Sequence, residues 1–181
     1  MKGIVFTEFL ELVEDRFGLE TVEEIIADAN VPSEGVYTAV DTYPHSELVS
    51  LVVALSKKSG AEVRELVRIF GHHMFGRFLA MHPEFFEPHK ETFSFLESVD
   101  QHIHVEVRKL HSDAELPKFE NQRDGNTLRL TYSSSRGFDA LAQGLIEGSI
   151  AHFGEDIELS SQDRSEGKGT LVDFILTKKV A

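Results

Sequence analysis

A change of hydrophobic pattern near Pro117 constrains the fold of this chain more than any other feature. Before it, apolar residues recur at the three- and four-residue spacing of amphipathic helices; after it, short strand-like runs lie between turn residues. Asp-Gly-Asn at 124–126 predicts one β-hairpin, and Glu-Gly-Lys-Gly at 166–169 predicts a second. The predicted strands cover residues 117–122, 127–134, 155–162 and 169–178. A helix over 138–153 is expected between the two hairpins.

The helical part of the chain comes first. Helices are predicted over residues 3–17, 20–29, 47–58, 61–81 and 90–111. Gly71 and Gly76 lie inside the fourth helix, where they weaken it relative to alanine or allow a neighbour or a ligand to approach closely. The order of elements predicts a single α+β domain with two lobes. A helical N-terminal lobe takes about 1–60, and a C-terminal lobe over about 61–181 holds a four-stranded antiparallel sheet with helices.

One predicted strand has an unusual face. Alternation along residues 128–136 places these side chains together: Leu128, Leu130, Tyr132, Ser134 and Arg136. The row begins apolar and ends in two hydroxyls and a guanidinium, the group that grips carboxylate or phosphate through two parallel hydrogen bonds. It suits a ligand with an apolar body and an anionic edge. The alternative is a strand that ends in a polar loop.

Composition excludes several classes of function. The 181 residues carry a formal net charge of −13, which argues against nucleic acid or an anionic membrane as a partner. Because there is no cysteine, disulfides and thiolate ligands for zinc, iron–sulfur clusters or haem are excluded. No apolar run approaches the ~20 residues that span a bilayer. The start of the chain, with an acid at Glu8, does not fit a signal peptide, so we expect a cytoplasmic protein.

Nine histidines raise the question of a metal. His102 and His104 lie on the predicted helix over 90–111, at ~200° from each other, so at most one faces an inner pocket. Each falls on a flank of the apolar stripe, ~100° from its centre, and the helical wheel does not choose between them. A core histidine without a metal is the alternative. No His-Glu-x-x-His, nucleophile elbow, P-loop or dinucleotide-binding motif is present.

Three segments together resemble the haem-nitric oxide/oxygen-binding (H-NOX) family, whose members include the haem domain of soluble guanylate cyclase. The start of the chain, Met1-Lys2-Gly3-Ile4-Val5, is similar to the family's opening. The segment Ile103-His104-Val105-Glu106-Val107-Arg108-Lys109-Leu110, followed by Pro117, resembles its haem-ligating helix. Tyr132-x-Ser134-x-Arg136 resembles its haem-propionate motif.

The resemblance implies a haem b between the two lobes, with His104 rather than His102 as the proximal iron ligand, because the family's spacing to Pro117 fits His104. It implies that Tyr132, Ser134 and Arg136 bind the propionates, and that Pro117 packs against the macrocycle. The residues expected on the distal side are Val5, Phe9, Met74, Phe78, Leu141 and Leu145.

The resemblance also implies a function. Family members that bind oxygen stably carry a distal tyrosine at the position of Leu141, so we expect a sensor of nitric oxide, also binding CO, that excludes O2. The protein would not be an enzyme and would signal to a sensor histidine kinase or to a diguanylate cyclase or phosphodiesterase. One alternative is a haem- or metal-dependent oxidative enzyme with His72 or His73 as a distal acid–base group. A ligand-free interaction module is another.

Overall fold

The computed structural model describes residues 1–179, which form two compact units. The first is Met1–Phe70 and the second begins at Gly71. Helix α4 (Val63–Met81) contains this boundary, which lies later in the chain than the lobe boundary expected near residue 60. The units are described separately below.

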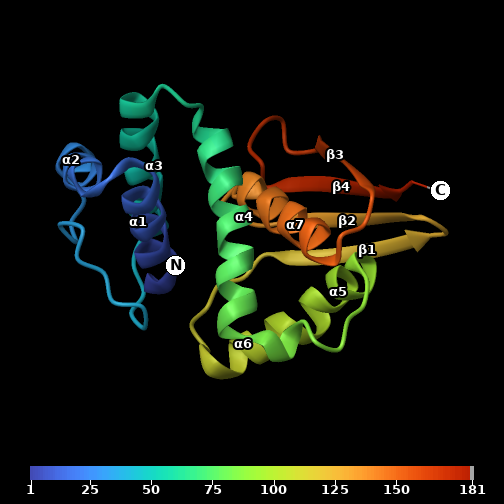
Figure 1. Cartoon of the computed structure of the whole chain (residues 1–181). Coiled ribbons are helices and arrows are strands. Elements are labelled where there is room, and N and C mark those ends of the chain that lie inside the picture. Colours follow the sequence, from blue (N-terminus) through green and yellow to red (C-terminus); the bar gives the residue numbers. More distant parts are fainter. Residues whose placement is uncertain (180–181) are drawn as a thin grey trace. The chain divides into compact units, whose positions relative to one another are not determined.

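The first unit is helical (Figure 1). It contains α1 (Gly3–Phe17), α2 (Leu19–Ala29), α3 (His45–Ser59) and the beginning of α4. Phe6 and Phe9 are buried on α1, and the ring of Phe9 meets that of Phe70 edge-on with centroids 5.3 Å apart. This packing fixes the face of α1 that carries Phe9.

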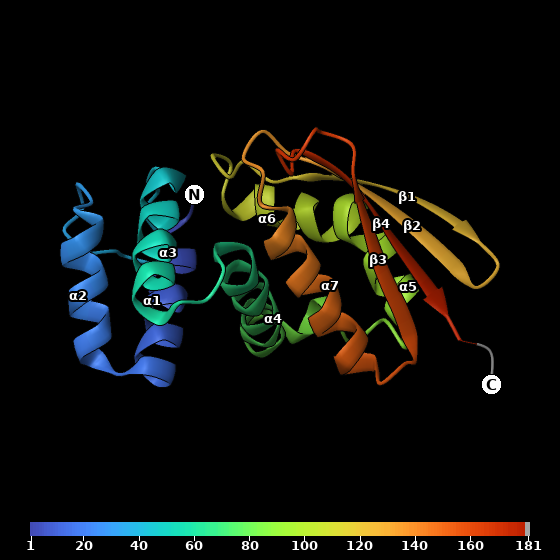
Figure 2. The ribbon, with the colours of Figure 1, turned by 90° about the horizontal axis from the view of Figure 1, so that it is seen from above.

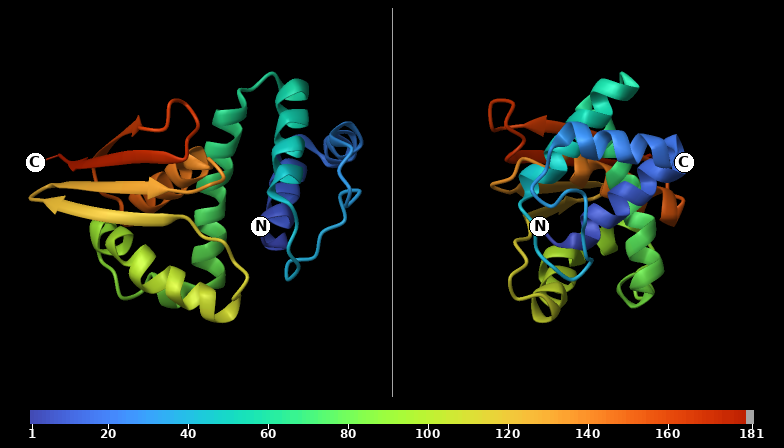
Figure 3. Two further views of the ribbon diagram at one scale, coloured as in Figure 1. Left: turned by 180° about the vertical axis from the view of Figure 1, so that it is seen from behind. Right: turned by 90° about the vertical axis from the view of Figure 1, so that its left-hand side faces the viewer.

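The second unit is built on a four-stranded antiparallel sheet, as predicted from the two hairpins (Figure 3). Its strands are β1 (Lys118–Asp124), β2 (Thr127–Ser133), β3 (Ile157–Asp163) and β4 (Leu171–Lys178). They lie in the order β1-β2-β4-β3. One face holds the core, formed in part by Leu128, Leu130 and Tyr132 on β2 and Phe174 on β4. The predicted alternation along β2 is therefore confirmed as far as Tyr132.

Within residues 1–179, helices cover only one face of this sheet, as Figure 2 shows. They are α5 (Thr92–Ser98), the π-helical segment η2 (Val99–Ile103), α6 (His104–Leu110) and α7 (Asp139–Phe153). A short 3₁₀ turn, η1 (Pro83–Phe85), connects α4 to α5. The helix and the two hairpins predicted after Pro117 are all present, and the α+β class is confirmed.

Two predicted elements differ in detail from the structure. The helix expected over 90–111 is interrupted by the π-helical segment, and β2 ends at Ser133, so Ser134–Arg136 form a turn rather than a continuation of the strand. In that turn the Ser134 hydroxyl accepts a hydrogen bond from the Arg136 N–H at 3.2 Å. Local bonding of this kind competes with a strand ladder.

The two glycines of α4 have different surroundings. A Cβ at Gly71 would lie 2.2 Å from the Leu141 carbonyl oxygen, so only glycine allows this approach of α4 to α7. On α7, a Cβ at Gly148 would lie 2.6 Å from the Cβ of Phe75. Gly76, by contrast, has nothing within 4 Å of where a Cβ would be. Close approach therefore explains Gly71 but not Gly76.

Candidate functional site

The π-helical segment decides which of the two neighbouring histidines turns inward. The His104 N–H donates to the Val99 carbonyl, five residues back, so this turn holds one residue more than a regular α-helical turn. One extra residue rotates everything after it by ~100° relative to an unbroken helix. That rotation turns His104 inward from the flank on which an unbroken helix would place it. Accordingly, the His104 side chain is 12% exposed, whereas His102 is exposed.

His104 lies in a partly apolar, partly acidic environment. Its ring centroid is 6.0 Å from that of Phe119, and its Nδ1 is 3.4 Å from Asp100 Oδ1. Burial lowers the pKa of His104, although the Asp100 carboxylate and a backbone hydrogen bond to Pro117 oppose the shift. The ring is therefore neutral near pH 7, which is the form of imidazole that binds a metal.

Tyr132, Ser134 and Arg136 gather where β2 ends. The Tyr132 side chain is 2% exposed, and its hydroxyl accepts a hydrogen bond from the Phe138 N–H at 3.2 Å. Burial raises the pKa of Tyr132, so the hydroxyl stays protonated at neutral pH and keeps a hydrogen to donate. Contacts with the Ser134 hydroxyl link the three residues into one cluster.

The guanidinium of Arg136 is oriented to take a carboxylate. It donates to the Glu115 carbonyl at 3.3 Å and forms an ion pair with the Glu115 carboxylate. Only 15% of the Arg136 side chain is exposed, compared with 75% for Glu115. A largely buried arginine whose acidic partner is free in solvent fits the anionic edge expected from the sequence, because a ligand carboxylate has the same chemistry as the Glu115 side chain.

A row of aromatic rings connects His104 to the cluster of Tyr132, Ser134 and Arg136. Phe119 on β1 stands opposite Tyr132 on β2, with ring centroids 5.6 Å apart, and its other neighbour is His104. Pro117 immediately precedes β1 and is half-buried beside this row. The structure thus brings His104, Pro117, Tyr132, Ser134 and Arg136 into one region of the second unit.

The six predicted distal residues form three pairs, each spaced by four residues on one helix. Side chains at this spacing share a face. The pairs are Val5 and Phe9 on α1, Met74 and Phe78 on α4, and Leu141 and Leu145 on α7. In the second unit Met74 is buried, Phe78 and Leu145 pack against the core cluster, and Leu141 is half-buried. None of these side chains carries a hydrogen-bond donor.

Sequence reasoning missed three residues of this region, namely Asp100, Phe119 and Glu115. The position of Phe119 could have been predicted, because the turn at 124–126 fixes the hairpin register and places Phe119 opposite Tyr132. Asp100 lies four residues before His104, a spacing that brings side chains together on a helix. No sequence signal marked Glu115.

Other candidate sites are weaker. His72 is exposed, which does not suit the distal acid–base role considered for it, and His73 is half-buried. Within residues 1–179, no three His, Asp or Glu side chains gather as metal ligands do. No helix in this part of the chain has the length and apolar character needed to cross a bilayer.

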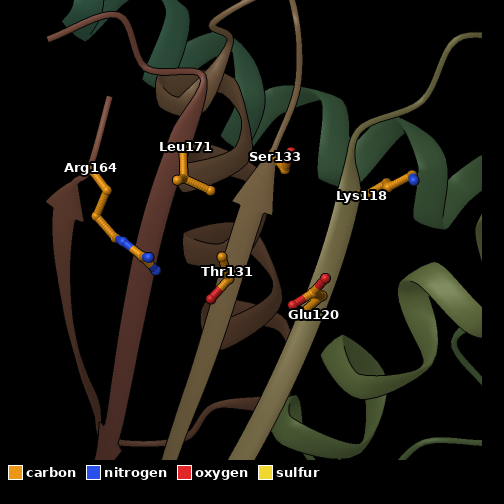
Figure 4. A pocket seen from close by; sticks show the side chains of 6 residues that line it. All are labelled: Lys118, Glu120, Thr131, Ser133, Arg164 and Leu171. Atoms are coloured by element: carbon orange, nitrogen blue, oxygen red, sulfur yellow. The ribbon is translucent and has the colours of Figure 1, made fainter. Parts of the chain in front are cut away.

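A polar hollow also lies on the face of the sheet that carries no helix (Figure 4). Its lining residues are Lys118, Glu120, Thr131, Ser133, Arg164 and Leu171. Buried Asp173 accepts a hydrogen bond from Thr131 at 2.8 Å and pairs with Arg164 at 3.3 Å. Since Tyr132 alternates with Thr131 and Ser133 and faces the core, this hollow is separate from the predicted site.

Comparisons with known proteins bear on the family and the fold of this chain. The family model described as Haem-NO-binding matches residues 2–161. The Fe(II) unliganded H-NOX protein from K. algicida is 39% identical, with a TM-score of 0.94 over 100% of this chain and 98% of that one. The IWP-051-bound H-NOX from Shewanella woodyi is 43% identical, with a TM-score of 0.84 over 99% and 95%. The H-NOX protein from S. oneidensis is 26% identical, with a TM-score of 0.91 over 99% and 100%. A comparison with curated proteins finds no match.

Proposed function

Since the chain belongs to the haem-NO-binding (H-NOX) family of haem-based gas sensors, we propose that it holds haem b through His104 and senses nitric oxide. The observation that carries this proposal is the placement of His104. It is the histidine that the π-helical segment turns inward, its ring is neutral, and Phe119 connects it to the Tyr132 cluster. An imidazole for the iron at one end of this row of rings and a carboxylate-binding cluster for the propionates at the other end fit an iron porphyrin.

Each residue of the region has a distinct task in this proposal. The Nε2 atom of His104 would bind the iron, while Arg136, Tyr132 and Ser134 would donate hydrogen bonds to the two propionates. Pro117, half-buried between α6 and β1, would pack against the porphyrin. When bound, the haem would supply a ferrous iron that binds NO.

We propose that the protein discriminates against O2 through its apolar distal residues. A bound O2 draws negative charge and is stabilised by a nearby hydrogen-bond donor, whereas NO binds ferrous iron without one. Leu141 and Leu145 on α7 offer no donor, and neither do Met74 and Phe78 on α4. The similar proteins from S. oneidensis and Shewanella woodyi have been captured as Fe(II)NO and Fe(II)CO forms, which supports NO and CO as ligands here.

The signal would pass to another protein. A sensor histidine kinase is our first candidate, and a diguanylate cyclase or phosphodiesterase is the second, because members of this family commonly regulate such enzymes. His104 begins α6, so a change in how its ring is held acts directly on that helix. The chain itself would act as a sensor and not as a catalyst.

Absorption spectra of the reduced protein under argon, air and NO test the proposal. We expect a five-coordinate ferrous haem spectrum under argon, the same spectrum in air, and a new one with NO. His104→Gly should abolish the five-coordinate species unless imidazole is added. The matched variant His102→Gly should keep it, because that side chain is exposed. A stable oxygen complex in air would contradict the selectivity, and loss of the species in His102→Gly alone would contradict the ligand assignment.

A further inference from the structure

Asp100 joins the candidate iron ligand to the sheet. Its Oδ1 atom lies 3.4 Å from His104 Nδ1 and also accepts a hydrogen bond from the Phe119 N–H at 3.3 Å. One carboxylate oxygen therefore contacts the ring on the helix and the backbone of β1. The carboxylate is 31% exposed, so it is shielded in part from competing water.

Asp100 lies inside the π-helical segment η2, and His104 directly follows that segment. Their four-residue spacing brings the two side chains together on the helix. A π-helical turn is less stable than a regular helical turn and recurs at functional sites. The bonds from Asp100 to His104 and to β1 offset part of that cost, and they hold the segment against the strand.

We propose that Asp100 is the positioning residue for His104, fixing the orientation of its ring and strengthening its bond to iron. This inference rests on the proposed role of His104 as the haem ligand. With Nε2 on the metal, Nδ1 carries the proton and donates a hydrogen bond to the Asp100 carboxylate. An anionic acceptor on the second ring nitrogen makes the first a better electron donor.

The shared oxygen has a second effect. Because the same Oδ1 atom binds the Phe119 N–H, the His104 ring cannot rotate freely without disturbing the first residues of β1. The Phe119 side chain contacts both His104 and Tyr132. Asp100 thus couples the strength of the iron–histidine bond to the hairpin that carries the propionate-binding residues.

Three variants of the haem-loaded protein test the role of Asp100. Asp100→Asn keeps an oxygen acceptor for β1 but removes the charge, and Asp100→Ala removes both. Glu106→Gln is the matched control, because Glu106 is a carboxylate on α6, the helix that His104 begins, and it pairs with Lys109 instead. The readouts are the iron–histidine stretching band of the ferrous protein, from resonance Raman spectroscopy, and the rate of haem loss to an excess of scavenger.

We expect the band to move to lower frequency in Asp100→Asn. The rate of haem loss should rise by roughly 10-fold, because losing the hydrogen-bond partner of a metal ligand typically weakens metal binding by about 10- to 100-fold. Glu106→Gln should match the unmodified protein in both readouts. An unchanged band in Asp100→Asn would overturn the inference. Absence of any iron–histidine band in the unmodified protein would instead overturn the proposed function, so the two failures are distinguishable.

Discussion

Replacing Arg136 by alanine should weaken haem binding far more than it weakens the fold. A charge-assisted hydrogen bond of this kind contributes about 1.5–3 kcal/mol, which corresponds to roughly 10- to 150-fold weaker haem binding. In the haem-free protein the variant loses chiefly the ion pair with Glu115. Since 75% of the Glu115 side chain is exposed, that pair contributes under about 1 kcal/mol.

Two measurements on the same samples separate these effects. Haem affinity comes from the rate of haem transfer to an excess of a scavenging apoprotein, and stability comes from thermal unfolding of the haem-free protein. Arg129→Ala is the matched control, because Arg129 lies on β2, the strand that precedes the turn with Arg136, is exposed and alternates with the buried Leu128 and Leu130. Equal haem affinity in the Arg136 and Arg129 variants would refute the propionate role. A parallel loss of stability in the haem-free Arg136 variant would show that the arginine serves the fold instead.

Three other substitutions test further parts of the structure. Leu141→Tyr adds a hydroxyl to the face of α7 that is predicted to be distal, so an oxygen complex should become visible in air by absorption spectroscopy. An unchanged spectrum would argue against the distal assignment. Gly148→Ala should lower the free energy of unfolding by about 1–3 kcal/mol, because overpacking outweighs the gain in helix propensity. Gly76→Ala adds its Cβ in open space and should raise the free energy of unfolding by up to about 1 kcal/mol. Lys178→Met removes the hydrogen bond that lowers the pKa of Glu91. That bond stabilises the fold above the ordinary pKa of 4.5, and the stabilisation is lost as pH falls through the depressed pKa. The destabilisation by Lys178→Met of about 1 kcal/mol at pH 7 should therefore shrink below pH 4.5 in denaturant unfolding; a difference that stays constant with pH would contradict the pairing.

Local pattern was enough to predict most of the fold. The turn residues at 124–126 and 166–169 determine the two hairpins, and alternation along β2 correctly places Leu128, Leu130 and Tyr132 on the core face. These features depend on residues that are close together in the sequence, so they can be predicted from the sequence alone. The family is likewise confirmed from short motifs in order along the chain.

Features that depend on distant contacts were not predictable in this way. A helical wheel assumes a constant rotation per residue, so it could not choose between His102 and His104. The π-helical segment that changes this rotation is joined to β1 by the hydrogen bond from the Phe119 N–H to Asp100. The extension of β2 to Arg136 was wrong because the Ser134 hydroxyl bonds to the backbone two residues on. The individual roles assigned to His104, Tyr132, Ser134 and Arg136 in holding haem stay predictions.

The π-helical bonding of η2 also links the direction of His104 to the hydrogen bonds of a single turn. Regular α-helical bonding over the same residues would turn the remaining part of α6 by ~100° and carry His104 back to the flank. Deleting one residue within Val99–Ile103 would remove the extra residue and restore α-helical bonding without that rotation. Relatives one residue shorter in this segment should therefore have a regular helix and still turn the corresponding histidine inward.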